Sequence, residues 1–556
     1  MGILNPYKDP YLDFAETERR RGKRQFSPWT TSDPELLELA RHYFPEIPLL
    51  PTELLEKPDM QAVEIRALKD RPALARLAHE AGFIAVGGPP AAAVALEQAL
   101  QGNSVLYASD LDKSLDGKQA RPIWAGAGNH GEPDTLTEAP AYIAGYQPLT
   151  FILKELLRAL LPAGYHSRVL DPDYPWLSLN LAEWLRNPRQ WPAAFRIAWG
   201  NHRLSRRYAQ ELQENHLPEV LQRMRKRTQI SWNYLENLNQ RLGGLIREPR
   251  GSLLIAGSPR QAEAYLRDAA FLKEEGLQLL PFTPEQALEK YGLLPRKAFA
   301  LMEKTHDFIF EPDFLKKMTA AVQKHGGEVQ NKWRLLRVYV DTDKNEGGIL
   351  EFREFTKAGE TIQHYRKFSR AHLSLGATPF HPSVYDLISV TGVSINALII
   401  GAELKGGPLV CGSSNHIVPL LPPQIIELKD PHSGQKRPVS VTFVRLSAAG
   451  CVSPVDRGDN WYTYDGRHAV HLLHRVRETL PPECSVKTLS VTGCNRVIGK
   501  EGQQMEVHPT LIVAGKKKVC EQVTIQIGAG GGGLTQMGAV PGAKAESCFS
   551  ASFRVN

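Results

Sequence analysis

Hydrophobic and polar positions alternate along the chain in a pattern that predicts interleaved strands and helices. Residues 83–87 form an apolar run that ends in a Gly-rich turn, and residues 93–100 continue with helical spacing. A second apolar run follows at 105–108. Strand, Gly-rich turn, helix and strand in this order are typical of a nucleotide-binding βαβ unit. We therefore expect an α/β domain that begins near residue 81.

The rest of the pattern predicts a second domain that is rich in strands. Helical periodicity covers residues 34–43, 61–80, 315–324 and most of 139–246. Strand patterns cover 251–256, 334–375, much of 380–475, and 523–527. Because helices and strands interleave throughout, the expected fold class is α/β with a β-rich second domain and a helical N-terminal extension.

Composition places the chain among ordinary globular proteins. Its 556 residues are 42% hydrophobic and 23% charged, with a net charge of +7. Lys and Arg are spread along the chain, so no nucleic-acid footprint is expected. The densest basic run, residues 19–24, leaves a peripheral membrane contact open, and a solvated arm is the alternative.

Cysteine usage and hydropathy bear on the cellular compartment. All six cysteines lie in the last third of the chain, and none forms a C-x-x-C pair. This pattern predicts reduced thiols and no metal site. No run of 18 apolar residues and no signal-peptide core is found. The expectation is a cytoplasmic protein without a transmembrane segment.

The Gly-rich turn departs from the usual G-x-G-x-x-G pattern, whose glycines would fall on Gly87, Pro89 and Ala92. Gly87 suits the tight turn, and Ala92 is small enough for close packing of helix on strand. Pro89 adds a ring and removes an N–H where a pyrophosphate would approach. The acidic residue expected at the end of the second strand would sit at Ser109, but Asp110 comes one position later.

Further motifs follow in an order that resembles a known superfamily. They are the Gly-rich loop 126–131, the strand 251–256, the segment 307–315 with 326–329, the run 371–377, the run 493–502 and the Gly-rich loop 528–533. From residue 83 to the end, the chain resembles FAD-dependent amine and amino-acid oxidoreductases of the D-amino-acid oxidase, glycine oxidase and sarcosine oxidase superfamily. Within 493–502, Val497 and Glu501 replace the family's Pro and Asp.

The resemblance implies a Rossmann-like FAD-binding domain and a β-rich substrate domain. The implied ranges are 1–80 for the extension, 81–250, 311–380 and 491–556 for FAD binding, and 251–310 and 381–490 for the substrate domain. The residues implied to contact FAD are Gly87, Gly88, Ala92, Asp110, Gly126, Gly128, Asn129, His130, Gly376, Ala377, Gly528, Gly530, Gly531, Gly532, Gly533, Leu534 and Thr535.

The closing loop 528–533 carries a physical argument of its own. A Gly-rich turn at a helix N-terminus directs several N–H donors to one point. In this superfamily that point is the flavin edge, where reduction places negative charge that the donors stabilise. A Gly-rich hairpin or a flexible tail is the alternative interpretation.

The implied reaction is oxidation of a C–N or C–O bond of a small, carboxylate-bearing substrate by hydride transfer to FAD. A carboxylate calls for a fixed, always-charged donor, which makes Arg445 and Arg496 candidates. His416 is a candidate proton carrier, and Tyr464 a candidate cap of the substrate pocket. Each of the four has a structural alternative, as an ion-pair partner or in sheet packing.

Two other functions stay open. Pro89 and Ser109 favour a non-catalytic protein that keeps the fold, binds its cofactor weakly or not at all, and uses its surface for a partner. A nicotinamide-dependent reductase is less favoured, since no second complete βαβ unit follows. The motifs do not select between oxygen, a quinone or another electron acceptor.

Overall fold

The computed structural model describes a large part of the chain, and the account below is restricted to that part. The described residues are 38, 42–43, 63–108, 178–179, 219–247, 252–256, 262, 279–295, 298–304, 309–310, 314–330, 333–343, 346–355, 361–375, 388–405, 409–411, 415–419, 422–429, 435–448, 451–453, 472–473, 476–498 and 505–527.

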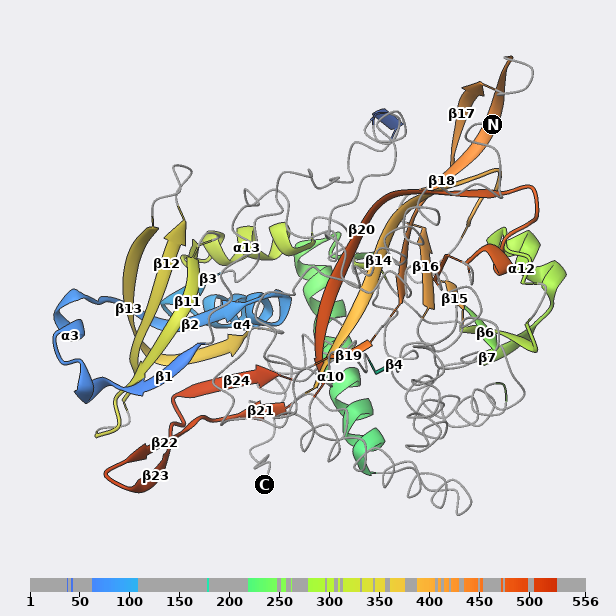
Figure 1. Ribbon diagram of the computed structural model, residues 1–556. Coiled ribbons are helices and arrows are strands. Elements are labelled where there is room, and N and C mark those ends of the chain that lie inside the picture. Colours follow the sequence, from blue (N-terminus) through green and yellow to red (C-terminus); the bar gives the residue numbers. More distant parts are fainter. Residues whose placement is uncertain are drawn as a thin grey trace, which may run out of the picture.

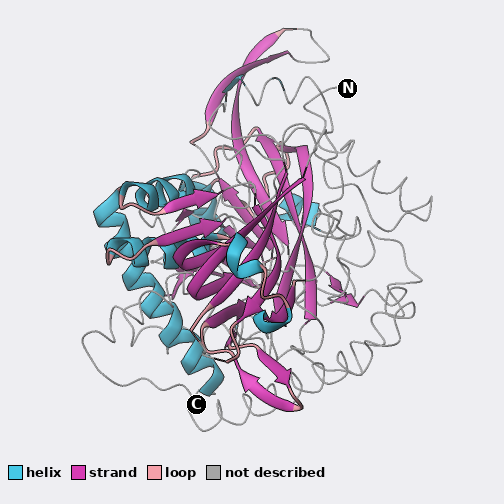
Figure 2. Ribbon diagram, turned by 90° about the vertical axis from the view of Figure 1, so that its left-hand side faces the viewer, coloured by secondary structure: helices cyan, strands magenta, loops and turns pink. Residues whose placement is uncertain are grey.

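Two large sheets and a group of helices organise these residues (Figure 1). The helices are α3 (Leu74–Leu77), α4 (Pro89–Leu100), α10 (Glu219–Leu242), α12 (Pro284–Tyr291) and α13 (Phe314–Lys324), with a short 3-10 helix, η2 (Leu68–Asp70), before α3. In Figure 2 the long helices lie together on one side of the strands. No helix among the described residues has the length and apolar character needed to cross a membrane.

The first sheet has nine strands in the order β1-β11-β12-β13-β2-β3-β10, with β24 beside β13 and β21 beside β24. Their bounds are β1 (Glu64–Ala67), β2 (His79–Gly87), β3 (Val105–Ala108), β10 (Glu328–Gln330), β11 (Trp333–Val340), β12 (Gly348–Phe355), β13 (Thr361–Ser374), β21 (Met505–Val507) and β24 (Val523–Ile527). Strands β11, β12 and the first half of β13 form an antiparallel meander.

Five strands of this sheet run parallel, in the spatial order β10-β3-β2-β13-β24. The chain visits β2, β3 and β10 in one direction and then returns to the other side of β2 for β13 and β24. The strand order therefore reverses between β2 and β13. In parallel sheets such a reversal is where ligands bind, outside the carboxyl ends of the two strands.

The second sheet has eleven strands, in the order β4-β19-β14-β18-β16-β15-β6-β8-β7, with β17 beside β18 and β20 beside β14. Their bounds are β4 (Ser178–Leu179), β6 (Ser252–Ala256), β7 (Leu279–Phe282), β8 (Ala300–Lys304), β14 (Ile388–Ile400), β15 (Leu409–Cys411), β16 (Asn415–Pro419), β17 (Gln424–Lys429), β18 (Lys436–Ala448), β19 (Cys451–Ser453) and β20 (Ser485–Ile498). Most neighbouring strands are antiparallel, and the exceptions are β6 with β15 and β4 with β19.

Two small pairs complete the strand inventory of the described residues. Strand β5 (Ile246–Arg247) pairs with β9 (Ile309–Phe310). Strands β22 (Thr510–Val513) and β23 (Lys516–Val519) form a separate hairpin.

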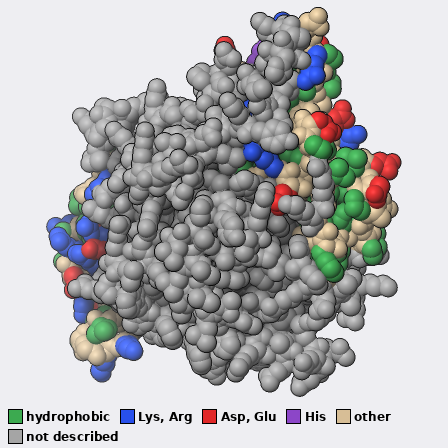
Figure 3. All heavy atoms as spheres, turned by 45° about the vertical axis from the view of Figure 1, so that its right-hand side comes forward, with side chains coloured by type: hydrophobic (Ala, Val, Ile, Leu, Met, Phe, Trp, Pro, Cys, Tyr) green, Lys and Arg blue, Asp and Glu red, His purple; other side chains and the backbone are tan. Residues whose placement is uncertain are grey.

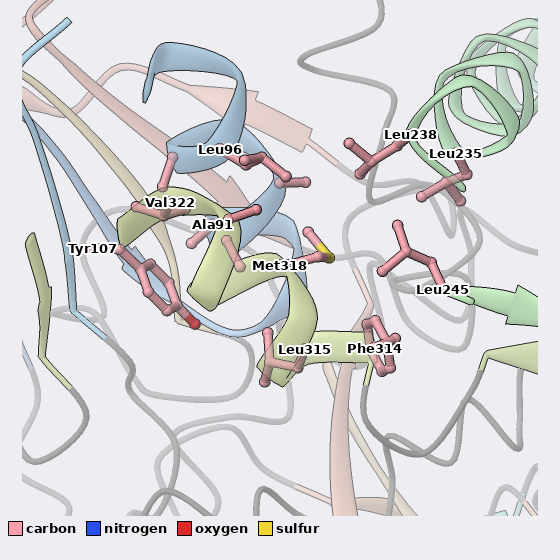
Figure 4. Close-up of a cluster of buried hydrophobic side chains, with 14 of the residues drawn as sticks. Ala91, Leu96, Tyr107, Leu235, Leu238, Leu245, Phe314, Leu315, Met318 and Val322 are labelled. Carbon is pink, nitrogen blue, oxygen red and sulfur yellow. The ribbon is translucent and has the colours of Figure 1, made fainter. Parts of the chain in front are cut away.

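One hydrophobic cluster joins the helices to both sheets. Helix α4 buries a run of small side chains from Ala91 to Ala95 against β2 and β3, and α13 packs across it (Figure 4). Leu235 and Leu238 of α10 face Leu245 and Phe314 in the same cluster. The cluster continues to Leu398, Phe443 and other residues of the second sheet. Burial of these apolar side chains stabilises the contact of the helices with both sheets.

The expected α/β class is confirmed, and several expected elements match closely. Strand β24 has the expected bounds, and β2, α4 and β3 follow in the expected order. The expectation of a helix over 61–80 is wrong, because Glu64–Ala67 form strand β1. These four residues pair with Arg337–Val340 of β11, and the Glu64 carboxylate binds the Arg337 guanidinium at 2.9 Å. Pairing with a partner more than 270 residues away outweighs the local helical pattern.

The sheets bear on the proposed domain ranges, which remain a proposal. Strand β1 lies within 1–80 but belongs to the nine-stranded sheet. Strand β20 crosses the proposed boundary at 490 and stays in the eleven-stranded sheet to residue 498.

Candidate functional site at the carboxyl ends of the parallel strands

The turn between β2 and α4 holds two glycines with different physical requirements. Gly87 has φ +130°, and a Cβ added there would lie 2.0 Å from the Ser374 carbonyl oxygen. Only glycine fits this close approach of β2 to β13. Gly88 has an ordinary φ of −82°, and no heavy atom of the described residues lies within 4 Å of the position its Cβ would take. The turn is therefore tight on the Gly87 side and open at Gly88.

The first turn of α4 offers few donors to an anion. Gly88 is the N-cap, and Pro89 and Pro90 occupy the first two helical positions, where neither carries an N–H. The Gly88 N–H donates to the Ser374 carbonyl at 3.2 Å. A helix N-terminus ordinarily presents four such groups. Of the four here, two are missing and one is already bonded, which leaves the Ala91 N–H.

A buried polar network lies beside this turn. The Ser374 hydroxyl donates to Gln526 Oε1 at 2.7 Å, and His372 Nε2 lies 3.0 Å from both oxygens. The Tyr107 hydroxyl donates to the Gly87 carbonyl at 2.9 Å. Among the described residues, Gln526 Nε2 is buried without a hydrogen-bond partner. Since a buried amide without a partner is costly, this nitrogen is a candidate contact for a ligand or a bound water.

Pairing registers explain why these groups meet. His372 is opposite Ala85 on β2 and opposite Thr524 on β24, and Ser374 is opposite Gly87. Side chains two residues apart on a strand share a face, so His372, Ser374 and Gln526 lie on the face that α4 covers. The carboxyl ends of three parallel strands thus contribute polar groups to one place.

The second sheet holds a separate set of three polar residues in the middle of its strands. Asn396 on β14 is opposite Arg445 on β18, and Leu398 is opposite Lys487 on β20. Asn396, Arg445 and Lys487 are all buried. They share a face with Leu398, a member of the cluster that also holds α4, α10 and α13. Two cationic side chains therefore lie on the face of this sheet that is turned to the helices.

The two arginines expected to bind a carboxylate are far apart. Arg445 is opposite Asn396, whereas Arg496 is opposite Val390, six residues away along β14. At about 3.3 Å per residue this separation is roughly 20 Å, so one carboxylate cannot contact both backbone positions closely. His416 lies on β16 opposite Ser447, two residues from the row that holds Arg445. In Figure 1 the arrowheads of β13 and β24 point toward the side on which β14 and β20 lie.

The other expected site residues lie outside the described residues. They are Tyr464, Asp110, Gly126, Gly128, Asn129, His130, Gly376, Ala377, Gly528, Gly530, Gly531, Gly532, Gly533, Leu534 and Thr535. Of the expected cofactor-binding residues, Gly87, Gly88 and Ala92 are described, and all three lie in the turn and first helical turn after β2.

Several polar residues of this region were not anticipated from the sequence. His372, Gln526 and Asn396 each lie between two apolar neighbours, whereas Lys487 lies between Val486 and Thr488. An isolated polar residue between apolar neighbours is a signal that could have drawn attention to the first three. The pairing of Ser374 with Gln526, 152 positions apart, had no sequence signal.

Several solved structures are similar to the chain in overall outline. No protein-family model matches the chain, and no curated protein matches it. Among solved structures, glycine oxidase from Geobacillus kaustophilus is similar at 14% identity and TM-score 0.45, over 86% of this chain and 96% of that one. L-proline dehydrogenase from P. horikoshii is similar at 11% identity and TM-score 0.46, over 86% and 96%.

A third structure, L-alpha-glycerophosphate oxidase from Mycoplasma pneumoniae with FAD bound, is similar at 12% identity and TM-score 0.44, over 84% of this chain and 94% of that one. Glycine oxidase is also among the enzymes that the sequence motifs resemble. TM-scores below 0.5 at such identities fix neither the family nor the activity, so function is inferred from the geometry of the chain itself.

Proposed function

We propose that the chain is an FAD-dependent oxidoreductase acting on a C–N or C–O bond of a small, carboxylate-bearing substrate. The observation that carries the proposal is the β2–α4 turn at the reversal of the parallel strands. No described residue crowds Gly88 there, and neither its backbone angle nor its packing against the described residues requires a glycine. An approaching ligand backbone or phosphate is the physical use of such space.

The space at the turn suits a dinucleotide, but the turn offers few N–H donors to its phosphates. Gly88 and the Ala91 N–H would face the phosphates. The missing N–H groups of Pro89 and Pro90 remove two charge-assisted hydrogen bonds, each worth about 1.5–3 kcal/mol in ordinary cases. We therefore expect FAD to bind reversibly and more weakly than at an N-terminus with free amides.

Arg445 is our candidate for the substrate carboxylate. Its guanidinium lies on the helix-side face of the eleven-stranded sheet beside Asn396, with Lys487 two strands away. Buried fixed cations orient an anion well, because little side-chain entropy is lost on binding. FAD supplies the hydride acceptor when it is bound, and the residues of the chain bind and orient the substrate.

The decisive experiment is the visible spectrum of the purified protein, followed by titration with FAD. We expect flavin absorbance or saturable uptake of FAD. Gly88→Val should abolish uptake by filling the open space and leave the melting temperature within about 2 °C, since no described neighbour is crowded. Gly88→Ala is the graded control. Uptake of FAD by Gly88→Val at wild-type affinity contradicts the placement of the cofactor.

The substrate assignment has its own test. In flavin-loaded protein, carboxylates that perturb the flavin spectrum should bind at least tenfold more weakly to Arg445→Met, a change of about 1.4 kcal/mol. Arg496→Met is the comparison, because its backbone lies six residues away along β14. Equal losses of carboxylate affinity in both variants would contradict the assignment of carboxylate binding to Arg445.

A non-catalytic binding protein is the second candidate, and the two prolines at the start of α4 favour it. In that case the protein is colourless, takes up no FAD at millimolar concentration, and is unaffected in stability by the cofactor. Thermal melting with and without FAD separates the two candidates, because a ligand that binds only the folded state raises the melting temperature.

A further inference from the structure

The β22–β23 hairpin projects from one end of the nine-stranded sheet (Figure 1). Its two turn residues, Ala514 and Gly515, have φ +51° and +76°. Positive φ at both central positions gives the tight turn whose twist matches a two-stranded ribbon. The base is closed by the Cys520 N–H, which donates to the Pro509 carbonyl at 2.9 Å. The hairpin is therefore a well-built element with a defined outer face.

The two faces of the hairpin differ. Thr510 is opposite Val519, and Ile512 is opposite Lys517, so these four side chains share one face. The other face carries Leu511, which packs against the core of the nine-stranded sheet. On the outward face Ile512 is 73% exposed and Val519 50% exposed. An apolar pair is thus held in solvent beside a lysine.

Basic side chains are frequent in the hairpin and in a neighbouring segment, and Lys517 shares the apolar face. The hairpin, residues 510–519, carries three lysines and no acid, and the neighbouring segment 68–77 carries Lys69, Arg71 and Arg76 with one acid, Asp70. Six basic side chains and one acidic one give these twenty residues a net charge of +5, against +7 for the whole chain. None of the six forms an ion pair within the part of the chain that the structure describes.

Both segments lie at the same end of the molecule in Figures 1 and 2, and β22 contacts β1, which leads directly into η2. Figure 3 shows Lys and Arg side chains gathered along this edge. Segment 68–77 adds a further exposed apolar side chain, Leu77, at 60%. We name this surface, residues 68–77 and 510–519, the basic end.

We propose that the basic end docks the protein onto an anionic membrane surface, with Ile512 entering the interface and the lysines contacting lipid headgroups. Exposed apolar side chains on a lysine-rich hairpin match the two parts of such a surface, the acyl boundary and the negative headgroups. An anionic protein is the other partner with this chemistry. The small apolar area, two or three side chains, is far below that of a specific protein interface, which favours the membrane.

The test uses the full-length protein and sedimentation with vesicles. We expect binding to vesicles of phosphatidylcholine and phosphatidylserine, no binding to phosphatidylcholine alone, and release by salt. Neutralising the hairpin in K516Q/K517Q/K518Q should weaken binding roughly a hundredfold, since each lysine near such a surface contributes about fivefold. Ile512→Ser should also weaken vesicle binding, because it removes the apolar side chain, whereas Ile512→Leu should bind vesicles like the wild type.

The β17–β18 hairpin supplies a matched control. Ile425 is 62% exposed there, on a face that carries charges of both signs, Glu427 and Lys436. Ile425→Ser and Lys436→Gln should leave vesicle binding unchanged, and circular dichroism should show all variants folded. Unchanged binding in the β22–β23 variants overturns the proposal, even if the protein binds vesicles by another segment. If the β22–β23 variants lose self-association and keep vesicle binding, the hairpin is a protein interface, and the proposal is also overturned. Neither result depends on FAD.

Discussion

The carboxyl end of the parallel strands and the helix-side face of the eleven-stranded sheet bury polar groups in different ways. In the first region Ser374 and Gln526 sit at the last residues of their strands. In the second, Asn396, Arg445 and Lys487 sit within theirs. Parallel strands all end at one edge, so their termini collect there. Antiparallel neighbours end at opposite edges, so a site must be built on a face from residues in register.

Both sheets hold buried polar groups with hydrogen-bond partners and others without one among the described residues, such as Ser440 Oγ and Thr488 Oγ1 in the second sheet. The Thr442 hydroxyl in the second sheet donates to the Ala402 carbonyl at 3.0 Å and accepts from the Leu404 N–H at 3.1 Å. Gln526 in the first sheet keeps an amide nitrogen without a partner among the described residues. A buried group whose hydrogen bonds are all made within the protein needs no ligand, whereas a buried group that lacks a partner can bind one.

Gly87→Ala should have the largest effect. The Cβ would lie 2.0 Å from the Ser374 carbonyl, at a φ of +130°. We expect a loss of more than about 3 kcal/mol in the free energy of unfolding, because the β2–β13 pairing must shift. Urea denaturation measures it. Gly88→Ala, one residue later, should stay within about 0.5 kcal/mol of wild type. Similar losses in both variants contradict the contrast between a tight and an open side of the turn.

Thr442→Val tests a structural hydroxyl of the eleven-stranded sheet, on the face opposite to that of Arg445. It keeps the shape of the side chain and leaves the Leu404 N–H and Ala402 carbonyl without the hydroxyl. The expected cost is about 1–3 kcal/mol of unfolding free energy, with FAD affinity unchanged. Thr442→Ser should recover most of the stability. A change in FAD affinity at equal stability contradicts the structural role.

Pro90→Ala tests the donor count at the start of α4. The change adds one N–H beside the open space at Gly88. We expect FAD to bind about tenfold more tightly, because one charge-assisted hydrogen bond is gained. Titration followed by fluorescence measures the dissociation constant, and Pro72→Ala, in an exposed turn, is the control. An unchanged affinity shows that the phosphates do not approach this helix.

Ser374→Ala removes the donor to Gln526 Oε1 from the polar network. We expect a loss of about 1 kcal/mol in stability, together with a weaker FAD affinity. Ser369→Ala, on the same strand but exposed, should affect neither. This variant and Thr442→Val together sharpen the comparison, since only the residue at the carboxyl end should couple to the cofactor.

Glu64→Gln should have the smallest effect, and it concerns pH. The hydrogen bond from Arg337 is the main cause that holds the pKa of Glu64 below its ordinary value of about 4.5. A lowered pKa stabilises the folded protein above that value, and the contribution is lost as the pH falls through the folded pKa. The variant should be less stable by about 0.5 kcal/mol at neutral pH, discounted for exposure, and the gap should close in acid. Melting curves from neutral pH to about pH 3 test this. A stability difference between the two proteins that does not change with pH would show that the Glu64–Arg337 ion pair does not stabilise the fold.

The fold was largely predictable where local pattern and tertiary pairing agree. The apolar runs at β2, β3 and β24 and the periodicity of α13 predicted their elements well. Residues 64–67 were not predictable as a strand, since their partner on β11 is distant in the sequence. The same reason hides the network of His372, Ser374 and Gln526, whose members come together only when β24 joins β13.

The sequence by itself determined the succession of β2, α4 and β3, the Gly-rich turn after β2, and the loss of two N–H donors to Pro89 and Pro90, because these follow from the identities of adjacent residues. Only the tertiary structure decided that Gly87 must be glycine, that no described residue crowds Gly88, and that Arg445 and Arg496 pair with positions of β14 six residues apart. Such properties depend on the distance between chain segments, which strand pairing sets and residue identity alone does not.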